Sequence, residues 1–242
     1  MTLPRNNSPL SSLDALRALV RRERDNDPLI GVKLGSQVGL DLLVDQLRTE
    51  RGVHAETLMA MAGRLIGQSV LASLWEEARE NGHERIPGLR KVSCWDGTDY
   101  LVGAPLHQRL TEGLGSPWEV VGEAARQEGC LELPNREELL QEGLRRLGTP
   151  AFLIPQVPEP HLPLLRGGSE HDTPWPLLRP LCASCCAAPR EWPLLCGLLA
   201  ARGVRLVASH LDPGLAFQLV LDSAIDASKI PLAEMAQGSA AA

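Results

Sequence analysis

Apolar positions recur every three or four residues through much of the chain, the spacing that places side chains on one face of an α-helix. Residues 54–80 carry the longest such pattern, and apolar or small side chains occupy nearly every side of it. A helix that is apolar all round is surrounded by protein, so we predict a central buried helix over residues 54–80. Gly63 and Gly67 each cost about 1 kcal/mol in helix propensity relative to alanine, so we expect another helix to pack closely against them.

Shorter helical patterns flank this central one. Each follows a serine, asparagine or aspartate, residue types whose side chains cap the first turn of a helix. Proline or glutamate within the next three positions strengthens the predicted starts at Ser116, Asn135 and Asp212. The other predicted starts are Ser11 or Ser12 and Ser36, the last preceded by a short apolar connection over residues 30–36. We expect roughly seven helices in all.

Three stretches depart from the helical pattern. Residues 92–102 hold two β-prone runs on either side of Asp96 and Gly97, a dipeptide that favours a hairpin turn. Residues 149–189 hold nine prolines, which remove backbone donors and disfavour long helices. Their large apolar side chains would be costly to expose, so we expect a proline-rich strap docked on the body. Residues 204–209 could form a further strand.

Together these elements predict a mainly α fold of the α+β kind. We assign residues 1–148 to a helical body with the hairpin and residues 149–189 to the strap. Residues 190–235 supply C-terminal helices that complete the same domain, and residues 236–242 should be a disordered tail.

Composition excludes some partners. A hydrophobic fraction of 44% and a charged fraction of 22% are ordinary for a soluble globular protein. The net charge of −6, with acidic and basic residues interspersed, argues against a nucleic-acid partner. The chain has no signal-peptide pattern and no run of eighteen apolar residues, so we expect a cytoplasmic protein without a membrane partner.

Four of the six cysteines fall within residues 182–196. Cys182 and Cys185 have the spacing of a zinc-ligand pair, which Cys196 and His171 could complete. Their small and apolar neighbours favour packing of the thiols in the core instead, since cysteine is among the most buried residue types. We therefore expect no cofactor, with zinc and then redox chemistry as the alternatives.

A second alternative uses the same cysteines. The pattern His54-Ala-Glu56, followed later by Pro180-Leu-Cys182-Ala-Ser-Cys185, resembles the two zinc-site motifs of nucleoside and nucleobase deaminases. The resemblance implies that His54 and the two cysteines bind zinc while Glu56 moves protons. The sequence departs from that family by the leucine after the proline and by more than a hundred residues between the halves. His54 and Glu56 also suit the first turn of a helix.

Two further pairs of polar residues each share a helix face. If Arg64 and Gln68 lie on the buried central helix, the guanidinium needs a carboxylate or a bound anion, which makes the pair a candidate ligand site or half of a buried ion pair. Asp222 and Asp226 could bind a metal or transfer protons. With Lys229 one turn later, their spacing instead indicates a solvent-exposed charged stripe.

The chain lacks the motifs of common enzyme classes, including phosphate loops, serine-hydrolase elbows and zinc-protease helices. This leaves open an enzyme whose site is assembled from scattered residues. We expect a non-catalytic, bacterial-type accessory module that binds a protein partner or a second copy of itself. The alternative is a zinc-binding protein or a zinc-dependent hydrolase or deaminase-like enzyme. The prolines of residues 155–163 have a spacing that aromatic-lined grooves accept, so the strap is one candidate contact segment.

Overall fold

A computed structural model describes residues 9–164, 174–233 and 235, and in these residues the protein is mainly α-helical with one small antiparallel sheet. Its α-helices are α1 (Pro9–Glu23), α2 (Ile30–Leu47), α3 (Ala55–Glu80), α4 (Ala104–Thr111), α5 (Pro117–Gln127), α6 (Arg136–Arg145), α7 (Trp175–Cys185), α8 (Trp192–Val207) and α9 (Pro213–Ala227). The sheet consists of β1 (Arg90–Ser93) and β2 (Asp99–Val102), and two short 3-10 helices are η1 (Glu159–His161) and η2 (Pro189–Glu191). The predicted mainly α fold with one hairpin is confirmed. The predicted tail, residues 236–242, lies outside the described residues.

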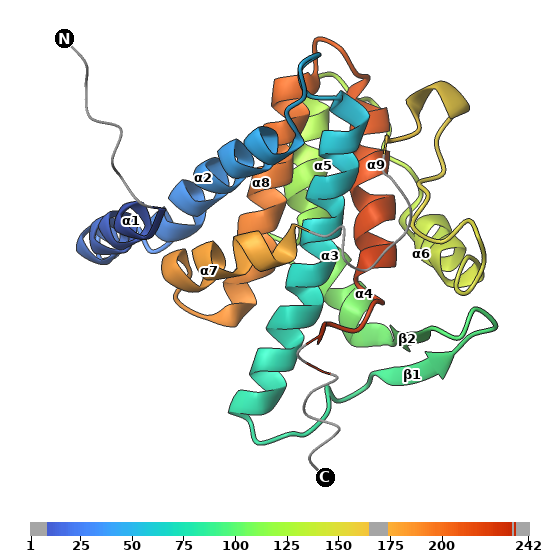
Figure 1. The fold of residues 1–242 in the computed structure, drawn as a ribbon, viewed down its shortest axis with the longest axis horizontal. Helices are drawn as coiled ribbons and strands as arrows, with labels where there is room; N and C mark the ends of the chain where they lie inside the picture. The colour runs from blue at the N-terminus through green and yellow to red at the C-terminus, as the bar shows by residue number, and fades with distance from the viewer. Residues whose placement is uncertain (1–8, 165–173, 234, 236–242) are drawn as a thin grey trace.

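The predicted central helix is confirmed as α3. It runs through the middle of the molecule beside α8 and α9, with α1, α2 and α7 on one side and α6 and the hairpin on the other (Figure 1). By length and composition alone, α3 could cross a membrane, but 94% of its apolar window is buried inside the protein. A helix buried by its own neighbours passes this test as readily as a spanning one.

The two glycines of α3 lie at a close helix contact, as predicted. A Cβ atom added at Gly63 would overlap the backbone carbonyl of Val220, and one added at Gly67 would overlap that of Ala224. Both carbonyls belong to α9. The absence of side chains at these positions therefore lets the two helix backbones approach, which offsets the low helix propensity of glycine.

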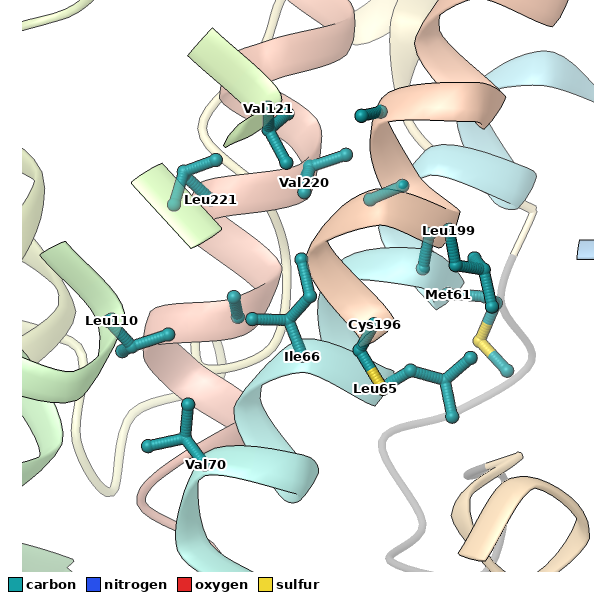
Figure 2. Packing of buried hydrophobic residues seen from close by; sticks show 14 of the residues in the cluster. Met61, Leu65, Ile66, Val70, Leu110, Val121, Cys196, Leu199, Val220 and Leu221 are labelled. Carbon is teal, nitrogen blue, oxygen red and sulfur yellow. The ribbon is translucent and has the colours of Figure 1, made fainter. Parts of the chain in front are cut away.

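The buried apolar residues form a hydrophobic cluster that joins early and late parts of the chain. Figure 2 shows its middle, where side chains of α3, α8 and α9 interdigitate and α4 and α5 add further residues from the other side. The residues labelled there are Met61, Leu65, Ile66, Val70, Leu110, Val121, Cys196, Leu199, Val220 and Leu221.

Two predicted boundaries are wrong. The second helix begins at Ile30 rather than after Ser36, because the Asp27 carboxylate accepts the N–H of Leu29 at 3.1 Å and so helps to form the first turn. Residues 204–209 do not form a strand, since α8 continues to Val207. Both segments are apolar and short, and short apolar runs are ambiguous between helix and strand.

The expectation that prolines exclude regular structure from residues 149–189 is also wrong at one place. The helix α7 contains Pro180, although proline lacks the N–H that a helix interior uses. Four buried residues on one face, Leu178, Leu181, Cys182 and Cys185, have helical spacing. Burial of that face outweighs the one lost backbone hydrogen bond, and Pro176 lies in the first turn, where no donor is needed.

The hairpin has a three-residue turn rather than the two-residue turn that Asp-Gly most favours. Cys94 N–H donates to the carbonyl of Thr98 at 3.0 Å, and Gly97 N–H donates back to the carbonyl of Cys94 at 3.1 Å. Gly97 has a φ of +75°, the left-handed conformation that this turn requires at its last position. On its other side, β2 is attached to the body because Leu101 N–H donates to the carbonyl of Lys229 at 2.8 Å.

Candidate functional site

Arg64 and Gln68 lie on the buried middle of α3. The Arg64 guanidinium donates to the backbone carbonyl of Leu153 at 3.5 Å, so this arginine binds the strap. Gln68 is buried one turn further along, and its Oε1 atom accepts no hydrogen bond from the described residues. Arg64 therefore takes part in packing the strap on α3, and neither hollow described below includes Arg64 or Gln68.

The predicted exposed stripe on α9 is wrong, because Asp222 and Asp226 are buried. Arg146, just after α6, donates to both carboxylate oxygens of Asp222, with Nη1 3.0 Å from Oδ2, and its Nη2 lies 3.1 Å from Oδ2 of Asp226. Lys229 is fully buried beside them, with Nζ 4.0 Å from Oδ1 of Asp226. The spacing of polar residues along α9 does not reveal that Arg146, 76 residues from Asp222 in the sequence, packs over them.

Burial shifts the pKa values of Asp226 and Lys229 toward neutrality. It raises the pKa of Asp226 to about 6, against the attraction of Lys229 and Arg146. It lowers the pKa of Lys229 to about 8. Burial would also lower the pKa of Arg146, but the hydrogen bonding to Asp222 and the charges of the nearby carboxylates together outweigh it and raise that pKa. These are values that suit acid–base chemistry, but the exposed fractions of the Asp226 and Lys229 side chains are 2% and 0%, so no substrate reaches them.

The same cluster binds the backbone of residues 153–156. Its carboxylates accept the N–H of Leu153 at 3.0 Å and the N–H of Gln156 at 2.6 Å. Arg146 donates to the carbonyl of Ile154 at 3.0 Å. Leu153 has a φ of +66°, a conformation that costs a leucine about 1–2 kcal/mol, so these bonds also hold a strained backbone.

A second polar group lies at the start of α3, where Glu56 is placed between two histidines. The Nδ1 atom of His161 lies 2.9 Å from Oε1 of Glu56, and Nε2 of His54 lies 3.3 Å from Oε2. Burial alone would raise the pKa of Glu56, but the hydrogen bond from His161 and the charges of both imidazoles outweigh it and lower the pKa. Thr57 adds to the contact, because its hydroxyl accepts the N–H of Leu164 at 2.9 Å. This group attaches the strap to the first turn of α3.

His161 is the member of this group that sequence reasoning missed as a site residue. It lies 105 residues from Glu56 and carries no motif of its own. Its position among the prolines of the strap was the only signal in the sequence. That position indicated that the strap docks on the body, but not that it docks at the start of α3.

Three of the four cysteines within residues 182–196 lie in the core, and Cys186 is partly exposed. Cys182 and Cys185 are buried on α7, and Cys196 is buried on α8. A hydrogen bond with Cys196, together with burial, raises the pKa of Cys182 well above its ordinary value, and burial raises that of Cys185 to about 11. Cys182, Cys185 and Cys196 therefore pack within the apolar cluster of the core. His171 lies outside the described residues.

Among the described residues, no three side chains of histidine, cysteine, aspartate or glutamate are placed to hold a metal ion. His54 contacts Glu56 and Thr57 at the start of α3, whereas Cys182 contacts Cys196 between α7 and α8. The contacts of these residues therefore do not reproduce the zinc centre that the deaminase resemblance implies.

Two open hollows lie on the described surface. One, of about 370 Å³, is lined by Glu76, Arg179 and Trp192 together with two prolines and an alanine. The other, of about 450 Å³, lies at the start of α5 and includes Leu114 and Trp118. Neither contains the Glu56 group or the buried charges of α9, so the hollows and the titratable groups do not combine into one reaction site.

The most exposed large hydrophobic side chain of the described residues is Trp95, at the tip of the hairpin, with an exposed fraction of 99%. Its turn is held firmly. Besides the two backbone hydrogen bonds, Asp96 accepts the N–H of Thr98 at 3.0 Å and the hydroxyl of Tyr100 at 2.7 Å. Tyr100 is buried and packs edge-on against Phe152, so the hairpin is anchored to the body.

Comparison with known proteins finds no match to this chain among family models, curated proteins or solved structures.

Proposed function

We propose that this protein is a non-catalytic accessory module that binds a protein through the tip of its β1–β2 hairpin. The observation that carries the proposal is the full exposure of Trp95 on a hydrogen-bonded turn. Tryptophan is enriched among the residues that dominate binding energy at protein interfaces. A turn that is already ordered loses little conformational entropy on binding, so it presents the side chain at low cost.

The surroundings of the titratable groups support a non-catalytic role. Asp226 and Lys229 have pKa values near neutrality but no access to solvent. Glu56 and His161 are engaged with each other in docking the strap. Each group therefore has a structural use within the described part of the chain.

The proposal is tested by photo-crosslinking in cells that express the protein. A photoreactive phenylalanine analogue replaces Trp95 in one variant and Leu131 in a control, because Leu131 is almost as exposed, at 96%. We expect a discrete protein adduct from position 95 and none from position 131. An adduct of twice the chain mass would identify a second copy as the partner. The same adduct pattern from both positions, or none from either, would contradict the proposal.

The zinc alternative is separated from this proposal by metal analysis. The burial of Cys182 and Cys185 in the hydrophobic cluster leads us to expect well under one zinc per chain in protein purified without chelator. Near-stoichiometric zinc, lost together with the fold on chelation, would favour the zinc protein instead.

A further inference from the structure

The hydrogen-bonding pattern of the hairpin determines which backbone groups point away from it. Residues of an antiparallel pair alternate between pairs that bond each other and pairs whose N–H and C=O groups point outward. Lys91 pairs with Leu101, and the N–H of Leu101 points outward to the carbonyl of Lys229. Lys91 and Leu101 are therefore an outward-pointing pair, and two residues further along so are Ser93 and Asp99.

The two edges of the hairpin differ in what covers them. The body covers the edge of β2 through the Leu101 hydrogen bond. On the edge of β1, no described residue bonds the N–H of Lys91 or of Ser93, and all four residues of β1 are exposed. Figure 1 shows the hairpin projecting from the helices. The free edge therefore presents two N–H and two C=O groups at the spacing of a β-strand, and it ends beside Trp95.

The charges on β1 indicate which side chains the partner segment should carry. Lys91 is paired with Asp99 at 2.6 Å, whereas Arg90 has no ion-pair partner among the described residues. A lysine on an edge strand disfavours indiscriminate strand pairing. An acidic side chain of the partner segment, placed opposite Arg90, would form an ion pair with it.

We propose that the free edge of β1 binds an extended segment of the partner protein as a third strand, with an acidic residue of that segment opposite Arg90. Backbone hydrogen bonds to Lys91 and Ser93 fix the strand, while Trp95 packs against its side chains. This inference rests on the proposed function and specifies the kind of partner segment that the hairpin takes.

The test uses the full-length protein with the photoreactive group at position 95. Ser93→Pro removes the outward N–H and the hydroxyl that donates to Asp99, but leaves the backbone β1–β2 hydrogen bonds in place, and proline is tolerated at such an edge position. Ser93→Ala is the matched control, because it keeps the N–H. We expect Ser93→Pro to lower the adduct yield about tenfold, through the lost hydrogen bond and the proline ring, and Ser93→Ala to leave it near wild type. Arg90→Glu should also lower the yield.

Each result is informative. An adduct that Ser93→Pro leaves unchanged would overturn strand addition but keep the hairpin as the binding site, whereas no adduct at all would overturn both proposals. Amide hydrogen exchange of the isolated protein gives an independent measurement. Fast exchange at Lys91 and Ser93 beside slow exchange at Val92 supports a free edge, and slow exchange at Lys91 and Ser93 would show that the edge is already paired.

Discussion

At the scale of single residues, Asp226 shows how burial changes the chemistry of an ordinary side chain. The carboxylate loses hydration, which raises its pKa, while Arg146 and Lys229 only partly restore the stability of the charged form. Lys229 is shifted in the opposite direction for the same reason. Near neutral pH both groups are therefore charged at a cost in stability that neither would have in water.

The pH dependence of folding follows from these directions. Asp226 has a folded pKa of about 6 against an ordinary value of 3.8, so its contribution to stability is fully present below 3.8 and is lost as pH rises through 6. We expect wild-type protein to gain stability relative to Asp226→Asn as pH falls from 7 to 4. Urea unfolding of both proteins across this range measures the difference, and parallel curves would refute the shift. Lys229 acts in a separate window, because its contribution is present above 10.5 and is lost as pH falls through 8.

At the scale of elements, the contact between α3 and α9 depends on two positions that have no side chain. The groove at Gly63 is filled by backbone of α9, which cannot move aside as the end of a flexible side chain can. Among the helical glycines described, Gly197 on α8 differs from Gly63 because it has room beside it. At Gly197, an added Cβ would meet its nearest neighbour at 3.4 Å, an ordinary van der Waals distance.

This contrast gives a matched pair of substitutions. Gly63→Ala should destabilise the protein by about 1–3 kcal/mol, and Gly63→Leu by at least as much, because the side chain would force the helices apart. Gly197→Ala should be neutral or stabilise by roughly 0.5–1 kcal/mol through its higher helix propensity. Midpoints of chemical unfolding measure both effects. If the Gly63 variants and the wild type unfold at equal midpoints, the close helix contact is not the reason for a glycine at this position.

At the scale of the whole molecule, Arg146 joins three parts of the fold. It lies at the end of α6, pairs with both aspartates of α9 and donates to the backbone of the strap at Ile154. Without Arg146, the two buried carboxylates of α9 would have only Lys229 nearby to balance their negative charge. The cluster therefore couples the position of the strap to the packing of α6 on α9.

Loss of this arginine should affect the entire fold. We expect Arg146→Met to cost about 3–5 kcal/mol, the usual cost of leaving buried charges without their partner. Arg145→Met is the control, because Arg145 is the preceding residue, its side chain is 68% exposed and its pair with Glu142 is a surface pair. That change should stay within roughly 0.5 kcal/mol. Equal losses for the two variants in urea unfolding would contradict a coupling role for Arg146.

The sequence by itself determined the features that depend on near neighbours along the chain. Ser116 and Asn135 cap α5 and α6 as their types predict, because a cap is a bond between residues two or three positions apart. The central helix and the close contact at Gly63 were predictable too, since an apolar surface all round and a costly glycine each require a particular environment.

Only the tertiary structure decided which polar groups are buried and what they meet. Arg146 and Asp222 are 76 residues apart, and Glu56 and His161 are 105 apart. No local pattern encodes such pairs, because the same spacing of charges suits an exposed stripe or a buried cluster until another element covers it. Burial is a property of the packed chain, and it turned an expected solvated stripe into the buried charge cluster that fastens the strap to α9.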